Sequence, residues 1–173
     1  HRHPEAVIWR GSMHLPRHQQ PHPTTTRVKM QYFDLLDAPS VHQLMGECQP
    51  DAVIHLAAFS SVQNSWQRAV ETYAVNVMGT VHLLQALIHH GTPCRFVHVG
   101  SGDIYGHVTP EMLPIRESQL PRPANPYAAS KHASEIVAMQ HGISYPSIQP
   151  VLLRPFAHTG PGQSPGFVCP SFA

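Results

Sequence analysis

Tyr127 and Lys131 are the two residues of this chain whose types and spacing suggest proton transfer. They lie four apart in residues 125–131 (NPYAASK), and positions i and i+4 of a helix share one face. An ammonium beside a phenol stabilises the phenolate, so we expect Lys131 to lower the pKa of Tyr127 from its reference of about 10. Such a phenol can exchange a proton with a carbinol or carbonyl oxygen while hydride moves on the carbon. Lys131 is one of only two lysines, the other being Lys29.

Ser101 is the third candidate, because it follows an apolar segment that predicts a strand. Residues 95–106 (RFVHVGSGDIYG) read as a strand that ends in a turn of small residues. Ligands of open α/β sheets bind at the carboxyl ends of the strands, so a hydroxyl at this position can hold a reacting oxygen beside Tyr127. Alone, Ser101 would be an ordinary turn serine. Together with Tyr127 and Lys131 it predicts a catalytic trio.

With this trio in place, the chain resembles the extended short-chain dehydrogenase/reductase superfamily of nucleotide-sugar enzymes, the NAD-dependent epimerase/dehydratase family. The resemblance runs from about Ala6 to the last residue and is carried by motifs that occur in the family's order. These motifs are residues 33–37 (FDLLD), 51–58 (DAVIHLAA), 60–66 (SSVQNSW), 76–80 (NVMGT) and 154–168 (RPFAHTGPGQSPGFV).

The resemblance implies a role for each matched position. The implied catalytic residues are Ser101, Tyr127 and Lys131. The implied cofactor-binding residues are Arg10, Asp34, Leu35, Leu56, Ala57, Ala58, Asn76, Tyr127 and Lys131, and Asn76 would brace the active-site strand. The implied substrate-binding residues are Ser61, Ser101, Asp103, Ala157 and His158. No metal is implied, and the scattered histidines lack the spacing of a metal site.

The implied activity is the reduction of a GDP-linked 4-keto-6-deoxy sugar by NAD(P)H. Elimination of water would need an additional acid and base, whereas the serine turn carries a single acid, Asp103, with Gly102 before it and Ile104 after it. The alternatives are a 4,6-dehydratase acting on GDP-mannose and a nucleotide-sugar 4-epimerase of the same superfamily. An alternative of another class is a catalytically silent fragment that binds nucleotide weakly.

Two positions bear on the ligands. Arg10 follows an early strand where the NAD pattern has an acid, and arginine at that place accommodates the 2′-phosphate, so we expect NADP(H) rather than NAD(H). Ala157 replaces the asparagine of the family motif after the last strand. Loss of a charge-assisted hydrogen bond costs about 1.5–3 kcal/mol, so we expect this substitution to weaken binding of the substrate's phosphate.

Composition agrees with one α/β domain. The 173 residues are 42% hydrophobic and 12% charged with a net charge of +1, which argues against disorder and against a nucleic-acid partner. No apolar run approaches a membrane span. Three cysteines without C-x-x-C spacing, Cys48, Cys94 and Cys169, suit free thiols in the cytoplasm. The resemblance also implies a homodimer when the protein is intact.

Alternating strand and helix patterns predict a doubly wound parallel sheet, a partial Rossmann fold over residues 1–173 with the start of a substrate-binding region from about 156. Strands are expected at 6–9, 28–33, 53–57, 96–99 and 151–154. Helices are expected from a cap at Ser40 to 48, then at 66–77, 79–89 and 127–141. No glycine-rich turn of the dinucleotide type occurs near the start, so we expect a fragment or a degraded copy that binds nicotinamide cofactor poorly.

Overall fold

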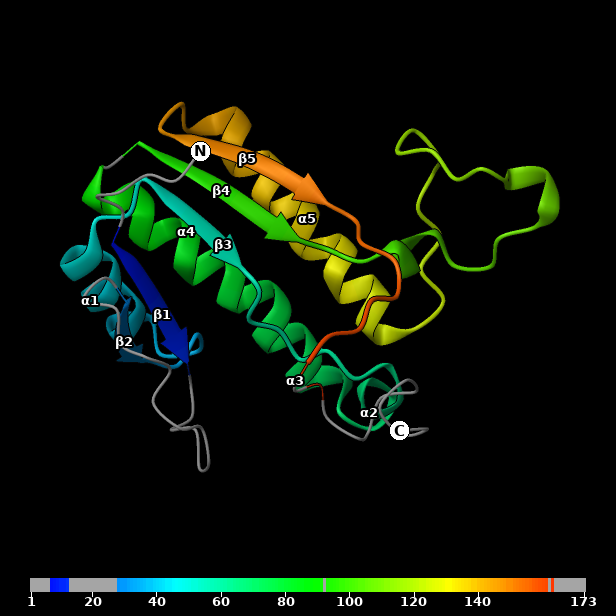
Figure 1. Ribbon diagram of the computed structural model, residues 1–173, viewed down its shortest axis with the longest axis horizontal. Coiled ribbons are helices and arrows are strands. Elements are labelled where there is room, and N and C mark those ends of the chain that lie inside the picture. The colour runs from blue at the N-terminus through cyan, green and yellow to red at the C-terminus, as the bar shows by residue number, and fades with distance from the viewer. Residues whose placement is uncertain (1–6, 13–27, 92, 162, 164–173) are drawn as a thin grey trace.

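The computed structural model describes residues 7–12, 28–91, 93–161 and 163. Within these residues strands and helices alternate along the chain, and all paired strands are parallel (Figure 1). A two-stranded sheet contains β1 (Ile8–Ser12) and β2 (Val28–Tyr32), and a second sheet has the order β3 (Ala52–His55), β4 (Cys94–Val99), β5 (Ile148–Leu153). The predicted α/β class with parallel strands is confirmed.

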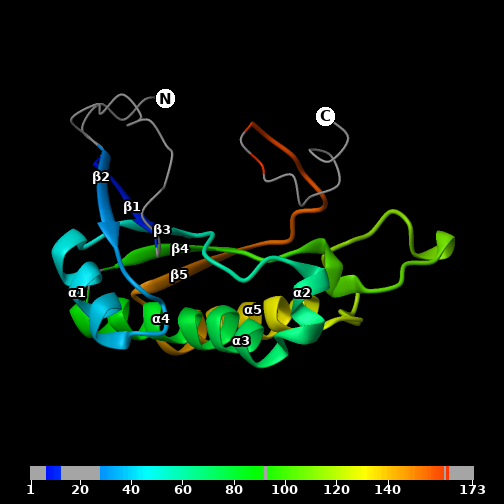
Figure 2. The ribbon, with the colours of Figure 1, turned by 90° about the horizontal axis from the view of Figure 1, so that it is seen from below.

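The helices are α1 (Ala38–Cys48), α2 (Val62–Gln67), α3 (Ala69–Tyr73), the π-helical turn η1 (Ala74–Met78), α4 (Gly79–His90), the 3₁₀ turns η2 (Gly102–Tyr105) and η3 (Pro110–Met112), and α5 (Pro126–Ser144). Figure 2 shows α4 and α5 side by side under one face of the β3–β4–β5 sheet, while α1 packs against α4. The side chains that face this helical layer alternate along β4, where Cys94, Phe96 and His98 are buried.

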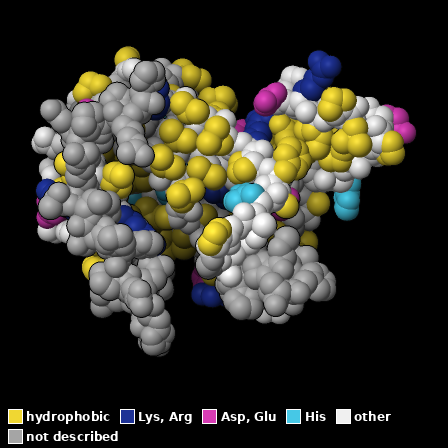
Figure 3. Space-filling view, viewed as in Figure 1, with side chains coloured by type: hydrophobic (Ala, Val, Ile, Leu, Met, Phe, Trp, Pro, Cys, Tyr) yellow, Lys and Arg dark blue, Asp and Glu magenta, His cyan; other side chains and the backbone are white. Residues whose placement is uncertain are grey.

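The hydrophobic core lies between the strands and this helical layer. Its buried members are Leu35, Val41, Leu44, Met45, Leu83, Leu84, Ala86, Leu87, Cys94, Phe96, Ala138 and Ile148. The opposite face of the β3–β4–β5 sheet exposes apolar side chains from its edge strands, among them Ile54, Val151 and Leu153. Figure 3 views that face and shows hydrophobic side chains gathered on it. Among the described residues, therefore, helices cover one face of this sheet.

The starts of two helices differ from the prediction. Asp37, not Ser40, is the N-cap of α1, because Pro39 suits the first turn of a helix. The Ser40 hydroxyl instead donates to the Asp34 and Asp37 carbonyl oxygens at 3.1 and 2.9 Å. The predicted helix at 66–77 begins earlier, since Ser61 caps α2 by accepting from the backbone N–H of Asn64 at 3.2 Å.

The strands agree with the prediction in order and differ at their ends. β1 runs to Ser12 rather than to Trp9, and the predicted first residue, Ala6, lies outside the described residues. β5 begins at Ile148 and includes Pro150. Among the described strands β5 pairs only with β4, so β5 is an edge strand. A proline is tolerated on an edge strand, because its missing N–H can face the side that has no neighbouring strand. The substrate-binding region expected from about 156 stays a prediction.

Candidate active site

Ser101 begins the turn that follows β4 and is buried. Its backbone is extended (φ −157°), and its Oγ accepts the backbone N–H of Asp103 at 3.2 Å. Oγ acts as the acceptor there, and the Ser101 hydroxyl also forms a side-chain hydrogen bond with Tyr127. The turn is bound to the last residue of β5 by the N–H of Gly100, which donates to the Leu153 carbonyl at 2.7 Å. A Cβ on Gly100 would lie 2.7 Å from that same carbonyl oxygen, so only glycine permits this approach.

Tyr127 lies in the first turn of α5 and Lys131 one turn later. Asn125 caps the helix by accepting the N–H of Ala128 at 2.8 Å, and Pro126 takes the position where no N–H is needed. The backbone N–H of Tyr127 donates to Ser65 Oγ at 3.2 Å, which ties the start of α5 to α2. Tyr127 is half-buried, and Lys131 is 4% exposed. Local helix geometry and two side-chain caps thus position the pair.

The electrostatics of this pair correct one expectation. Burial raises the pKa of Tyr127, Asp103 raises it further, and the neighbouring Ser101 hydroxyl only partly offsets the rise. The predicted lowering of the Tyr127 pKa by Lys131 is therefore wrong for this structure, because burial disfavours the charged phenolate. Burial also lowers the pKa of Lys131 to about 8. At neutral pH the pair consists of a neutral phenol and an ammonium.

Asn76 lies in the π-helical turn η1 and is buried. Its Oδ1 accepts the Phe59 N–H at 2.7 Å, while its Nδ2 donates to the Phe59 carbonyl at 3.2 Å and to Ser130 Oγ at 2.8 Å. The Asn76 amide thus joins the loop after β3 to α5. Its expected contact with the cofactor and its expected bracing of the active-site strand stay predictions.

Two buried histidines lie close to Lys131. Burial, followed by the charges of His98 and Lys131, lowers the pKa of His55 to about 3. Burial and the charge of Lys131 lower the pKa of His98 to about 4 against the opposing effect of Glu135. His98 Nε2 lies 3.2 Å from Ser134 Oγ, whose own proton goes to the Lys131 carbonyl at 2.9 Å. His98 Nε2 must therefore carry the proton, which leaves Nδ1 as a buried acceptor without a partner among the described residues.

The other residues expected at the site fall into three groups. At the carboxyl end of β3, Leu56 and Ala57 are exposed and Ala58 is half-buried, so backbone and small side chains border the open sheet face there. Arg10 on β1 is exposed. Asp34 is exposed and accepts the N–H of Leu36 at 2.9 Å, whereas Leu35 is buried in the core.

The expected substrate-binding residues lie on two segments. Asp103 is exposed beside Ser101, and Ala157 and His158 are exposed after β5, where His158 Nδ1 lies 2.9 Å from the Phe156 carbonyl. Ser61 is half-buried at the start of α2. These positions are compatible with the predicted roles, which stay predictions.

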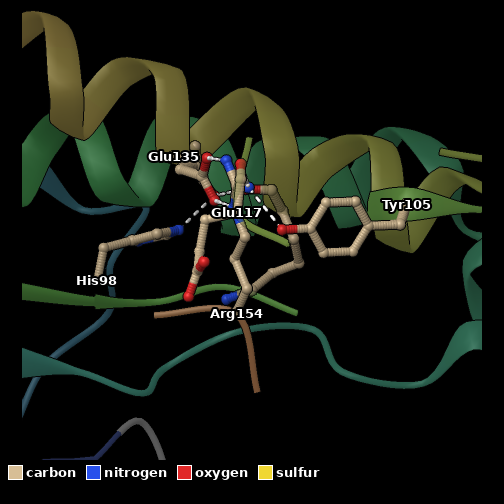
Figure 4. A network of polar contacts seen from close by, with 7 residues as sticks. His98, Tyr105, Glu117, Glu135 and Arg154 are labelled. Atoms are coloured by element: carbon tan, nitrogen blue, oxygen red, sulfur yellow. Dashed lines mark hydrogen bonds and ion pairs between the residues drawn. The ribbon is translucent and has the colours of Figure 1, made fainter. Parts of the chain in front are cut away.

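The sequence analysis missed a polar network centred on Arg154, which is drawn in Figure 4. Arg154 Nε donates to Glu135 Oε2 at 3.0 Å and Nη2 donates to Oε1 at 2.6 Å. Nη1 donates to the Tyr105 hydroxyl at 2.7 Å and to the Glu117 carbonyl at 2.9 Å. The available signal was the position of Glu135, four residues after Lys131 on the same helix.

In the part of the chain that the structure describes, no three His, Cys, Asp or Glu side chains are arranged to hold a metal ion. No helix there is both long enough and apolar enough to cross a membrane. A hollow of about 260 Å³, bordered by Asp51, Cys94 and Arg95 among others, lies at the amino ends of the strands, opposite the end that carries Ser101.

The known proteins that this chain resembles include enzymes that act on nucleotide sugars. Residues 6–173 match the profile of a family described as GDP-mannose 4,6 dehydratase. GDP-6-deoxy-D-mannose reductase from Pseudomonas aeruginosa is 43% identical over 141 residues, which are 82% of this chain and 46% of the relative. A dTDP-glucose 4,6-dehydratase from Streptomyces griseus is 34% identical over 146 residues, 84% of this chain and 42% of the relative.

Solved structures agree with these relatives. The structure of RMD from Pseudomonas aeruginosa complexed with NADPH has a TM-score of 0.75 at 41% identity, and the match covers 82% of this chain and 49% of that one. DesIV, a dTDP-glucose 4,6-dehydratase from Streptomyces venezuelae with NAD bound, has a TM-score of 0.79 at 32% identity, with 87% and 45% covered. The chain thus spans about half the length of the relatives it matches.

Proposed function

The chain belongs to the extended short-chain dehydrogenase/reductase family of nucleotide-sugar oxidoreductases with a Rossmann-like fold, and from this premise we propose that it carries the catalytic residues of a ketone reductase. The substrate would be a GDP-linked 4-keto-6-deoxy sugar and the cofactor NADPH. The observation that carries the proposal is the arrangement of Ser101, Tyr127 and Lys131 at the carboxyl ends of β4 and the start of α5, with Asp103 as the single acid of the serine turn.

The residues present fit the nicotinamide end of a dinucleotide. The segment 56–58 at the end of β3, of which Leu56 and Ala57 are exposed, would border the nicotinamide, and Lys131 would hold its ribose. When bound, the cofactor supplies hydride to the ketone carbon. The 2′-phosphate of NADPH would be met by Arg10, and the NADPH complex of the Pseudomonas relative supports this choice over NADH.

The chain's own residues would manage the proton. Tyr127, whose pKa is raised by burial, is protonated at neutral pH and can donate to the ketone oxygen. The hydroxyl of Ser101, which is a hydrogen-bond neighbour of Tyr127, would hold that oxygen in place before transfer. Lys131, with a pKa of about 8, remains an ammonium at neutral pH and would stabilise the phenolate left behind.

A 4,6-dehydratase is the second candidate, because the matching family profile carries that description. Dehydration would require a proton to leave C5 and the C6 hydroxyl to depart, which needs a further acid–base pair beside the serine turn. Asp103 is exposed and has Gly102 and Ile104 as chain neighbours. A single carboxylate favours the reductase.

The test is an assay of NADPH oxidation with GDP-4-keto-6-deoxymannose and, separately, with GDP-mannose. We would assay the chain alone and joined to the complementary segments of the Pseudomonas reductase, since the chain matches 46% of that enzyme. In the joined protein we expect reduction of the keto sugar, no reaction of GDP-mannose, and a loss of about 10²–10⁴-fold in Tyr127→Phe. In the chain alone we expect poor binding of the cofactor and correspondingly little reduction. Conversion of GDP-mannose to the keto sugar without net NADPH use would instead identify a dehydratase.

A further inference from the structure

Glu135 is the only buried acid among the described residues, and it lies one helical turn after Lys131. Positions i and i+4 are neighbours on a helix surface, so a free carboxylate at 135 could reach the Lys131 ammonium. Both groups are 4% exposed. Opposite charges taken out of water attract strongly, which makes a Lys131–Glu135 pair the default expectation for this face of α5.

The structure shows a different pairing. Arg154, which directly follows β5, occupies both carboxylate oxygens of Glu135 through Nε and Nη2. The Glu135 side chain is 5% exposed in this pair and that of Arg154 is 19% exposed. Lys131 forms no ion pair within the described part of the chain, which contains only the Arg154–Glu135 and Arg68–Glu71 pairs.

The remaining nitrogen of Arg154, Nη1, holds the guanidinium in one orientation. Nη1 donates to the Tyr105 hydroxyl and to the Glu117 carbonyl, so the guanidinium is held from η2 and from the loop before α5 as well as from the helix (Figure 4). A guanidinium has a rigid planar set of donors, and a lysine at this position could not make the same contacts. Glu135 is therefore held on the side of α5 that faces β5.

We propose that Arg154 is a positioning residue whose planar fork keeps the Glu135 carboxylate from pairing with Lys131, so that the ammonium stays available to Tyr127. The catalytic meaning of this arrangement rests on the proposed reductase function, but the arrangement itself does not. Without Arg154, Glu135 is left as an uncompensated buried charge. The nearest relief is a pair with Lys131, which draws the ammonium one turn away from Tyr127.

The other charged or titratable groups around this stretch do not supply such a partner. They are Tyr127, His132 and His141 on α5, His55 on β3, Glu71 and Tyr73 on α3, His82, His89 and His90 on α4, Cys94, Arg95 and His98 on β4, Asp103 and Tyr105 on η2, and Glu117 on the loop before α5. Of the three acids in this set, Glu71 is exposed and paired with Arg68, and Asp103 and Glu117 are exposed.

The test is the pH titration of Lys131 in the purified chain by NMR with ¹³C-labelled lysine. The chain has two lysines, so Lys29→Arg assigns the two signals. The unaltered chain should titrate near pH 8, because burial lowers the Lys131 pKa to about 8. In Arg154→Met the midpoint should rise by about 1–3 pH units, since a close opposite charge shifts a pKa by that amount.

A double variant distinguishes the positioning role of Arg154 from a purely structural role. Glu135→Gln combined with Arg154→Met removes the competing carboxylate, so the Lys131 midpoint should return to its value in the unaltered chain. Glu135→Gln alone should leave the midpoint unchanged. Arg68→Met, which breaks the exposed pair with Glu71, is the matched control and should also leave it unchanged.

An unchanged midpoint in Arg154→Met would overturn the proposal, as would a raised midpoint that persists in the double variant. If Arg154→Met does not fold, Arg154→Gln keeps a neutral donor and leaves the carboxylate charge in place, and its Lys131 midpoint must rise. The titration needs neither cofactor nor turnover. A failed reductase assay with the expected titration would therefore reject only the proposed function.

Discussion

Acid should destabilise this chain through His55 and His98, which are 4% and 0% exposed. Their folded pKa values are lowered to about 3 and about 4 from an ordinary value of 6.5, mainly by burial. Between those values and 6.5 the unfolded chain binds protons that the folded chain does not, so stability rises with pH in this window. The stability is lost as the pH falls below about 6.5.

The size of the effect follows from the same values. One pH unit is worth about 1.4 kcal/mol for each proton taken up on unfolding. At pH 5, about 1.5 units below the unfolded value, each histidine lowers the free energy of unfolding by about 2 kcal/mol, or about 4 kcal/mol together. Domains of this kind have about 5–15 kcal/mol in total, so the loss is easily measured.

Glutamine is the matched replacement because it keeps the donor. Thr80 Oγ1 gives its proton to the Asn76 carbonyl at 2.7 Å, so His55 Nε2 must donate to Thr80 at 3.0 Å. A glutamine amide can make the same bond and does not titrate. The same reasoning applies to His98 and its contact with Ser134.

The assay is urea unfolding followed by circular dichroism at pH 7.5, 6 and 5. Between pH 7.5 and 5 the free energy of unfolding of the unaltered chain should fall. We expect His55→Gln and His98→Gln each to make this fall smaller by about 2 kcal/mol, and the double variant to make it smaller by both amounts. His107→Gln, at an exposed position, is the control and should retain the full loss. If the double variant lost as much stability as the unaltered chain, burial of neutral histidines would not be the cause.

Three further outcomes follow from single positions. Gly106→Ala should lower the free energy of unfolding by more than about 1 kcal/mol in urea, because Gly106 has φ +67° and its Cβ would clash with the Arg122 carbonyl oxygen; a neutral result would mean that the turn rearranges freely. Asn76→Ala should cost about 2–4 kcal/mol, since it leaves buried partners unsatisfied, and a cost under about 0.5 kcal/mol in the same measurement would contradict the bracing role. Burial raises the pKa of the Cys94 thiol to about 11, so Cys94→Ser should not change the rate at which native thiols react with a disulfide reagent at pH 8, whereas Cys48→Ser should slow the reaction; a slower rate in Cys94→Ser would show that the β4 core opens.

The local features of this protein could be predicted from its sequence. The spacing of Tyr127 and Lys131 is a property of one helix, and Asn125 with Pro126 marks where that helix begins. The strand before Ser101 follows from its apolar run, and its end is a turn of small residues. Each of these depends on neighbours within one or two turns of chain, so the order of elements and the candidate trio follow without a tertiary structure.

The energetics of the trio were decided only by packing between distant segments. Lys131 was expected to lower the Tyr127 pKa, but burial by surrounding elements raises it, and desolvation cannot be counted from spacing. The pairing of Glu135 with Arg154 rather than with Lys131 joins residues 19 apart in sequence. That choice depends on where β5 ends relative to α5, which only the assembled sheet and helix layer determine.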